Sequence, residues 1–432
     1  MKPRIFLTSA LVAALFAGAN AQQAVSFKFD FGPGKAAPGY VQVLPEAVYS
    51  ATAGFGFDFG TRPSGLTRKG SNPLKSDLVR STTPFYFSVN VPEGNYEVRV
   101  TLGDPEGTSY STVKAESRRL MLENVRTFRG KFITKTFIVY VKDRKISTGG
   151  QVALKERELT KLDWDDKLTL EFDQETALSS LEISKVDDQV TVFLAGNSTV
   201  VNQEEEPWAS WGQMITRFFE PGVAIANQAE SGLSLGSFIG QKRLDKVLSV
   251  MKAGDFVFVE FGHNDEKEKG ANDGPYKSYS DRLRLFADKV KEKGGTLVIV
   301  TPTARRSFSG NTMVNTHGDY PDAARKVAVE KGVALIDLTA LSTQLFEAMG
   351  PEGSKNAFVI YPEKNMNDNT HFNPYGAYEL AKIIVEGIKA NKLSLAKYLV
   401  KRPAFDPRHP DAFAEFKWPE SPKVSLVKPD GN

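Results

Sequence analysis

The chain contains 432 residues, of which 41% are hydrophobic and 25% are charged, and its formal net charge is +3. This balance is that of a globular protein with real cores, and it excludes both a disordered chain and the basic excess of a nucleic-acid-binding protein. No cysteine is present, which excludes disulfides, thiol catalysis and cysteine-based zinc sites. Because domains commonly run to roughly 100–200 residues, the length predicts two or three of them.

Residues 1–21 show the pattern of a secretory signal peptide. Lys2 and Arg4 supply a charged start, an apolar run follows over 5–16, and residues 19–21 (Ala-Asn-Ala) form a small-residue cleavage site. The run is shorter than the ~20 apolar residues that a bilayer span requires, so we expect cleavage rather than a retained anchor. We therefore expect a secreted or periplasmic protein with no membrane span after signal cleavage.

Residues 22–188 are predicted to form an all-β sandwich domain. Apolar and polar residues alternate over 27–31, 96–100 and 167–172, as in strands with one buried face. Glycine and proline clusters such as 92–95 separate these runs, and no segment shows a convincing amphipathic helix. Two packed antiparallel layers are the architecture that this pattern favours.

Residues 189–395 show the pattern of an α/β domain. Almost continuous apolar runs, typical of strands buried on both faces, occur at Val190–Ala195, Val223–Ala226, Phe256–Phe261, Leu297–Val300 and Ala334–Ile336. Helical periodicity is clearest over Tyr279–Lys293 and Ala377–Ala390. This alternation predicts a parallel sheet with right-handed crossovers. Residues 396–432 are rich in proline and charge, and we expect an extended tail that packs over this domain or is partly disordered.

Three small or polar residues follow successive predicted strands, at the edge where doubly wound sheets bind ligands. Ser198 follows the first strand, Gly232 the second and Asn264 the third. A serine is a nucleophile only with a base nearby, whereas a glycine N–H and an asparagine amide can donate to an oxyanion. Taken singly, each residue has a simpler interpretation as a helix cap or a turn residue.

A carboxylate and a histidine precede the last predicted helix. Asn373 fits an N-cap and Pro374 the first helical residue, which places His371 on the loop before that helix. Asp368 lies three residues before the histidine, so one loop presents both side chains and the carboxylate fixes the imidazole tautomer. Such a pair is often purely structural, so it does not define a site by itself.

Taken together and in this order, the Ser, Gly, Asn and Asp-x-x-His motifs resemble the four sequence blocks of the SGNH, or GDSL-type, hydrolases over residues 190–390. The resemblance implies a three-layer, flavodoxin-like parallel-sheet domain with serine esterase activity and no cofactor or metal. Carried over by motif, the catalytic residues are Ser198, Asp368 and His371. The oxyanion hole is formed by the Ser198 N–H, Gly232 and Asn264.

Finer motifs are similar to those of bacterial rhamnogalacturonan acetylesterases, which remove acetyl groups from pectic backbones. The motifs occupy residues 208–213, 261–265, 318–320 and 368–372, while residues 29–32 and 54–58 resemble the galactose-binding-like sandwich found ahead of some of these enzymes. The resemblance implies an acetylated polysaccharide or oligosaccharide as substrate, with pectic rhamnogalacturonan as the first candidate.

Two residues depart from the pattern. Asn197 stands where most of the superfamily has Asp, and we expect the local geometry to survive because the two side chains are close in shape. Leu233 stands where relatives often carry an Arg after the oxyanion glycine. That Arg suits anionic sugars, so its absence weakens the assignment to pectin in particular.

Four further residues are candidate substrate contacts. Trp208 and Trp211 are interpreted either as a sugar platform or as a helix packing face, since residues three apart share a side of a helix. His263 and His317 are interpreted as substrate contacts or as structural support, and the second interpretation is favoured for His263.

The sequence leaves two other functions open. One is an esterase of the same fold that acts on another acyl ester, as a xylan acetylesterase, a lipase or a thioesterase. The other is a non-catalytic carbohydrate-binding protein, which the presence of every triad residue disfavours. Whether the sandwich binds sugar or is a structural appendage is also open.

Overall fold

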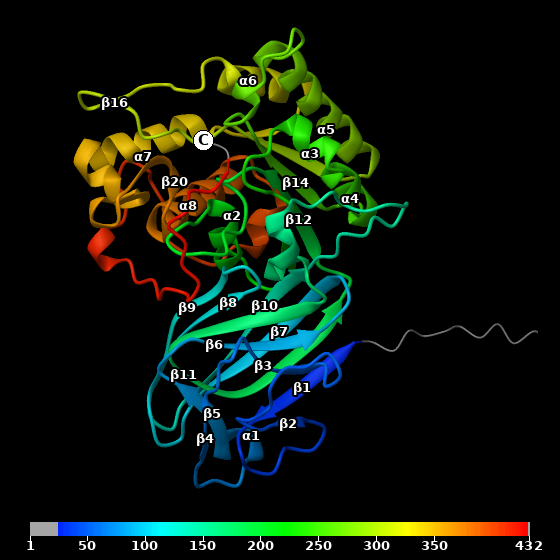
Figure 1. Cartoon of the computed structure of the whole chain (residues 1–432), viewed down its shortest axis with the longest axis vertical. Helices are drawn as coiled ribbons and strands as arrows, with labels where there is room; N and C mark the ends of the chain where they lie inside the picture. Colours follow the sequence, from blue (N-terminus) through cyan, green and yellow to red (C-terminus); the bar gives the residue numbers. More distant parts are fainter. Residues whose placement is uncertain (1–24, 431–432) are drawn as a thin grey trace, which may run out of the picture.

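The computed structural model describes residues 25–430, which form two domains stacked along the long axis of the molecule (Figure 1). An all-β domain comes first and an α/β domain follows, so the two fold classes predicted from the sequence are confirmed. The predicted signal peptide lies outside the described residues. Within residues 25–430, no helix combines the length and the apolar character that crossing a bilayer requires.

The all-β domain contains eleven strands and little helix. The strands are β1 (Ser26–Phe31), β2 (Val41–Val43), β3 (Phe55–Asp58), β4 (Ser64–Thr67), β5 (Asp77–Ser81), β6 (Phe85–Asn90), β7 (Gly94–Gly103), β8 (Ser109–Ala115), β9 (Arg119–Thr127), β10 (Phe132–Val141) and β11 (Lys167–Val186). A four-residue helix, α1 (Pro73–Ser76), precedes β5, and two 3-10 helices, η1 (Glu156–Thr160) and η2 (Leu162–Trp164), lie between β10 and β11.

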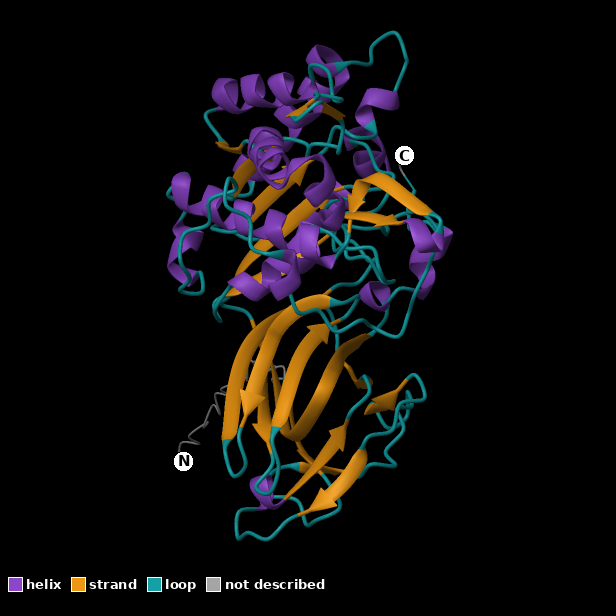
Figure 2. Cartoon of the chain, turned by 90° about the vertical axis from the view of Figure 1, so that its left-hand side faces the viewer, coloured by secondary structure: helices purple, strands orange, loops and turns teal. Residues whose placement is uncertain are grey.

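Strand β11 belongs to both layers of the sandwich. Its first half pairs antiparallel with β6 and β8, whereas its second half pairs with β5, β7 and β1. The register shifts between Leu178 and Ser180, and such an irregularity bends a strand and increases its twist. Figure 2 shows the resulting long curved strands, which enclose one core.

Aromatic side chains dominate that core. Phe31 and Phe57 pack against the ring of Phe87 with centroids 5.0 and 5.6 Å apart, and Phe85 stacks on Phe172 at 5.0 Å. These residues alternate with polar ones along their strands, which is the pattern that predicts a sheet with one buried face. All five rings are at most 1% exposed.

The α/β domain is built on a five-stranded parallel sheet in the order β13-β12-β14-β15-β18. Its strands are β12 (Val190–Gly196), β13 (Val223–Asn227), β14 (Phe256–Glu260), β15 (Thr296–Val300) and β18 (Ala334–Ile336), and a short hairpin of β16 (Phe308–Ser309) and β17 (Thr312–Met313) follows β15. This is the flavodoxin-like order 2-1-3-4-5, in which the direction of winding reverses between the first and third strands. Doubly wound sheets bind their ligands at such a reversal, which here lies between β12 and β14.

Helices cover both faces of the sheet. They are α2 (Trp211–Met214), α3 (Leu235–Gly240), α4 (Arg243–Val250), α5 (Ser280–Glu292), α6 (Tyr320–Lys331), α7 (Leu338–Gly353) and α8 (Pro374–Ala390). Phe256 and Phe258 of β14 pack with α2, α7 and α8, whereas Val257 and Val259 pack with α3 to α6. Burial on both faces explains why these strands appear in the sequence as continuous apolar runs.

The last helix begins as its sequence predicts. The Asn373 side chain accepts a hydrogen bond from the Gly376 N–H at 3.0 Å, and Pro374 is the first residue of α8. Gly376 is required there, because a Cβ would lie 2.0 Å from the Ala357 carbonyl oxygen. The segment before it differs from the prediction of a loop, which is wrong: Met366–Phe372 form strand β20, paired with β19 (Phe358–Tyr361).

The two domains share apolar and polar contacts. Tyr140 of β10 joins the core beneath Phe193 of β12, with ring centroids 6.2 Å apart. The Arg119 guanidinium donates to the carbonyls of Tyr140 and Ile225 at 2.8 and 3.1 Å, and Lys142 donates to the Asn227 carbonyl at 2.7 Å. These buried contacts fix the sandwich against β13, an edge strand of the parallel sheet.

Residues 396–430 run along both domains without long secondary structure. The 3-10 helices η8 (Ser394–Tyr398) and η9 (Phe413–Glu415) interrupt them. Lys114 of the sandwich donates to the Pro419 carbonyl and to the Ser421 hydroxyl, both at 2.8 Å. Farther along, Val424 forms a parallel β-bridge with Glu206 of the α/β domain. The segment thereby ends among the loops beyond the sheet, as the red end of the ribbon shows in Figure 1.

Candidate active site

Ser198 lies directly beyond the carboxyl end of β12, at the point where the winding of the sheet reverses. The turn is held by Asn197, whose Oδ1 accepts hydrogen bonds from the Thr199 N–H at 3.0 Å and the Thr199 hydroxyl at 2.9 Å. An Asp side chain would accept the same two bonds through its own oxygen. Asn197 therefore keeps the turn intact, although most of the superfamily has Asp at this position. Gln203 donates to the Ser198 carbonyl at 3.1 Å.

Ser198, His371 and Asp368 form a hydrogen-bonded chain. His371 Nε2 lies 2.9 Å from Ser198 Oγ, and His371 Nδ1 lies 2.8 Å from Asp368 Oδ2. Asp368 Oδ1 accepts from the backbone N–H groups of Thr370 and His371 at 2.8 and 2.9 Å. Although Ser198 and His371 are 173 residues apart in the sequence, the three side chains are buried together, with exposures of 3%, 1% and 5%.

The charge of Asp368 decides the imidazole tautomer. Burial raises the pKa of this carboxyl, but the hydrogen bonds from His371 and the two backbone N–H groups outweigh it and lower the pKa to about 2. The carboxylate is therefore ionised at neutral pH and accepts a proton-bearing Nδ1. This assignment leaves Nε2 to accept the Ser198 hydroxyl proton.

Gly232 and Asn264 line one groove. The groove has a volume of about 590 Å³, and its other lining residues are Lys155, Ser234, Ser237, Lys267, Glu268 and Asp430. Gly232 has φ +79°, a conformation that L side chains rarely adopt. Asn264 Nδ2 donates one hydrogen bond to the Leu233 carbonyl at 3.0 Å, while its Oδ1 accepts from Lys267 at 3.1 Å. The second amide N–H is thus oriented by the bonds on either side of it.

Of the two interpretations of Trp211, the structure favours the helix packing face over the substrate contact, because the side chain is 1% exposed in the core. Its Nε1 donates to Glu260 Oε2 at 2.5 Å, and the other oxygen of Glu260 accepts from Thr199 and Thr303. Trp208 lies at the site: its ring meets that of His371 edge-on with centroids 5.6 Å apart, and its Nε1 donates to the Ser425 carbonyl. Trp208 therefore remains a candidate contact, although only 3% of it is exposed.

His263 and His317 lie against each other, with ring centroids 4.5 Å apart. Both nitrogens of His317 are engaged, Nε2 with the Thr303 carbonyl and Nδ1 with Glu266, so the structure favours support over substrate contact. Burial lowers the pKa of His263 well below its usual value, and the neighbouring His317, Arg305 and His371 lower it further. His263 is therefore neutral, and among the described residues neither of its nitrogens has a hydrogen-bond partner.

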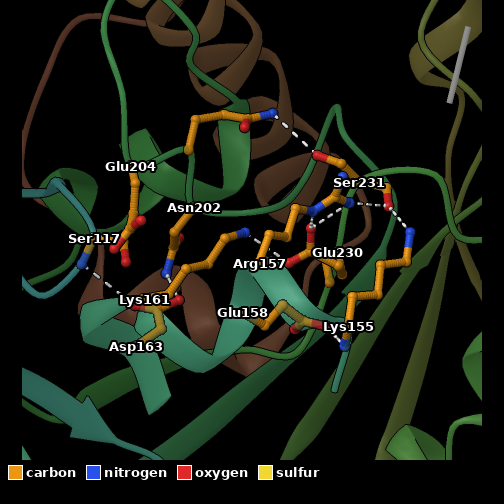
Figure 3. A network of polar contacts seen from close by, with 12 residues as sticks. Ser117, Lys155, Arg157, Glu158, Lys161, Asp163, Asn202, Glu204, Glu230 and Ser231 are labelled. Atoms are coloured by element: carbon orange, nitrogen blue, oxygen red, sulfur yellow. Dashed lines mark hydrogen bonds and ion pairs between the residues drawn. The ribbon is translucent and has the colours of Figure 1, made fainter. Parts of the chain in front are cut away.

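An ion-pair network that no sequence pattern indicated lies beside the site (Figure 3). Glu230, which is 1% exposed, accepts from Arg157 at 2.8 Å and from Lys161 at 2.7 Å, while Lys155 donates to the Ser231 carbonyl at 2.6 Å. The three cations belong to η1 and its flanks, ahead of the last sandwich strand. The fold brings these side chains close to Gly232. No periodicity or motif in the sequence indicates that they lie there.

Among residues 25–430, no cluster of three or more His, Asp or Glu side chains has a geometry that could hold a metal ion. The groups that meet at the carboxyl end of the sheet are instead a hydroxyl, an imidazole, a carboxylate and amide donors. A Ser–His–Asp chain at the reversal point of a doubly wound sheet is the arrangement of a serine hydrolase.

Comparison with known proteins agrees with this class. Residues 194–377 match the model of the GDSL-like lipase/acylhydrolase family, and residues 27–151 match that of the beta-agarase/YXIM esterase-like, galactose-binding domain-like family. The chain belongs to the GDSL-like lipase/acylhydrolase family and is an ester hydrolase. The predicted resemblance, including the galactose-binding-like domain ahead of the hydrolase, is confirmed.

Two relatives come from Bacillus subtilis (strain 168). Rhamnogalacturonan acetylesterase RhgT is 42% identical over 223 residues, which are 49% of this chain and 95% of RhgT. The uncharacterized esterase YxiM is 27% identical over 378 residues, which are 84% of this chain and 90% of YxiM. The crystal structure of Bacillus subtilis YxiM aligns with 86% of this chain and 99% of its own, at 27% identity and a TM-score of 0.45.

Proposed function

We propose that the protein is an exported acetylesterase that removes O-acetyl groups from an acetylated plant cell-wall polysaccharide, with pectic rhamnogalacturonan as its substrate. The observation that carries the proposal is the continuous Ser198–His371–Asp368 chain, with distances of 2.9 and 2.8 Å. Gln203 Nε2 contacts both the Ser198 carbonyl and the hydroxyl of Ser231, the residue before Gly232. The substrate rests on the name of RhgT, which is 42% identical to this chain. Export rests on the signal-like pattern of residues 1–21.

The geometry supports acyl transfer in two steps. His371 Nε2 takes the Ser198 proton while Ser198 Oγ attacks the acetyl carbonyl, so that a C–O bond forms and the carbonyl electrons move to its oxygen. N–H groups of Ser198, Gly232 and Asn264 are the proposed donors to that oxyanion. The carbonyl then re-forms as its bond to the sugar oxygen breaks, and His371 gives its proton to that oxygen, so the sugar leaves as an alcohol and the acetyl group stays on Ser198. His371 next takes a proton from water, which attacks the acetyl carbonyl. The bond to Ser198 Oγ breaks, His371 returns the proton to Ser198, and acetate leaves.

The test is acetate release by the purified protein from acetylated rhamnogalacturonan, acetylated xylan and an aryl acetate. Ser198→Ala should lower turnover at least about 1,000-fold, because the nucleophile is lost while binding is retained. Ser309→Ala, at an exposed strand residue, is the matched control and should act as the wild type.

Each outcome discriminates between functions. Release from the pectic substrate that disappears only in Ser198→Ala supports the whole proposal. Turnover of the aryl acetate or of xylan without release from pectin would keep the esterase and refute its substrate. No turnover of any ester would refute the enzymatic role and favour the carbohydrate-binding alternative.

A further inference from the structure

Two cations of the segment ahead of β11 meet beside Ser231 and Gly232. Lys155 lines the groove of Gly232, Arg157 lines the adjoining pocket, and both donate to the Ser231 carbonyl. Within the described structure, the buried carboxylate of Glu230 accepts from Arg157 and from Lys161 but not from Lys155. Burial lowers the pKa of Lys155, and the positive charge of the neighbouring Arg157 lowers it further. A further anion would therefore bind favourably at Lys155 and Arg157.

The structure places a carboxylate at this position. Asp430, from the C-terminal segment, forms ion pairs with Arg157 and with Lys155, the latter at 3.5 Å. A Cβ on Gly232 would lie 3.0 Å from Asp430 Cβ and 3.1 Å from Lys155 Nζ. The carboxylate and its two cations are therefore immediate neighbours of the proposed oxyanion donor.

The segment that carries Asp430 crosses the site. The Ser425 carbonyl accepts from Trp208, and Lys428 Nζ lies 3.5 Å from Asp368 Oδ2, before Asp430 reaches Arg157. Asp430 is nevertheless 59% exposed, and its cations are 26% and 34% exposed. Ion pairs at such exposure contribute little, about 0–1 kcal/mol. A ligand carboxylate can thus compete for the same cations.

We infer that Lys155 and Arg157 form a carboxylate subsite that binds a uronate of the acidic polysaccharide chain, and that Asp430 occupies this subsite when the substrate is absent. The inference rests on the proposed function, since it places the uronate next to the sugar whose acetyl group meets Ser198. Residues 155–157 lie outside both matched family ranges.

The test uses the full-length protein, with trigalacturonate as an acidic probe and xylotriose as a neutral one. Both are measured as inhibitors of aryl acetate hydrolysis. Trigalacturonate should inhibit competitively and xylotriose should not. Lys155→Gln should raise the inhibition constant of trigalacturonate about ten-fold, as expected for loss of one charged hydrogen bond. Lys145→Gln, at a lysine that is 84% exposed, is the control for a general loss of charge.

Asp430→Asn separates this subsite from a merely structural ion pair. Removing the competing charge should lower the inhibition constant of trigalacturonate several-fold, whereas a structural role predicts an unchanged or raised constant. Equal inhibition of wild type and Lys155→Gln, or weaker inhibition of Asp430→Asn, would overturn the subsite while leaving the esterase intact. If the protein hydrolyses no ester, the proposed function fails, and calorimetric binding of trigalacturonate to the same variants still decides on the subsite.

Discussion

Arg157 and Glu230 join the segment between two sandwich strands to the loop after β13 of the catalytic sheet. The guanidinium donates to Glu230 Oε1 from Nε at 3.1 Å and from Nη2 at 2.8 Å, and Lys161 occupies the other oxygen. Burial raises the pKa of Glu230, but Lys161 and Arg157 outweigh it and lower the pKa from 4.5 to about 2. The free energy of unfolding therefore depends on pH through the ionisation of Glu230.

Glu230→Gln should destabilise the protein by about 2–3 kcal/mol at pH 7, because the depressed pKa contributes stability wherever the carboxyl is ionised in both states. That contribution is complete above the unfolded pKa of 4.5 and is lost as pH falls through the folded pKa of about 2. Urea unfolding of variant and wild type at pH 7, 5 and 3 should show two curves that converge in acid. A difference independent of pH would contradict the linkage.

Asp368→Asn should lower kcat about 10³–10⁴-fold, because an amide cannot hold the Nδ1 proton of His371 as a carboxylate does. KM should change little, since the substitution leaves the groove beside Gly232 in place. Steady-state hydrolysis of an aryl acetate measures both constants. Asp281→Asn, on the exposed face of α5, is the control, and an equal loss in both variants would remove Asp368 from the mechanism.

Gly232→Ala should lower turnover and destabilise the chain by about 1 kcal/mol or more, because alanine is strained at φ +79°. Its Cβ would also press against Asp430 and Lys155 at 3.0 and 3.1 Å. Gly332→Ala is the matched control: Gly332 has φ +62° at the end of α6, and a Cβ added there would meet no described atom within 4 Å. Gly332→Ala should lower the unfolding temperature because of the same backbone strain, but it should leave turnover at the wild-type level.

Trp211→Phe should destabilise the hydrolase domain by about 1–3 kcal/mol, because buried Glu260 loses one of its hydrogen-bond donors. Turnover should fall with it, since Glu260 also accepts from Thr199, the residue after the proposed nucleophile. Thermal unfolding and aryl acetate hydrolysis should change together. A large loss of turnover at unchanged stability would instead indicate a direct role of Trp211 in the site.

The sequence was sufficient for the elements with a strong local signal. Residues 256–259 are all apolar because both faces of β14 are buried, and Asn373 and Pro374 mark the start of α8 by their own chemistry. The roles of Ser198, Asp368 and His371 came from the resemblance to the SGNH motif order, since each residue alone had a simpler structural interpretation. Asp368 and His371 were nevertheless expected on a loop, since nothing in Met366–Phe372 alternates in the manner of an amphipathic strand.

The remainder of the site depends on contacts without a local signal. Arg157 meets Glu230 across 73 residues of sequence, and Ser425 meets Trp208 across 217. These residues lie in irregular or 3-10 segments, where periodicity carries no information. Trp211 was indistinguishable from a surface aromatic because its partner, Glu260, lies at the end of a distant strand.

The pairing of β1 with β11 bears on how the protein folds. Ser26 lies opposite Ser184, 158 residues later, and β5, β6, β7 and β8 pair with the same β11. Contacts of such long sequence separation are slow to form because a large loop must close before they stabilise anything. Although β1 also pairs with nearby β2, it cannot join the rest of the sheet until β11 is present. We therefore expect the sandwich to assemble slowly and in one cooperative event.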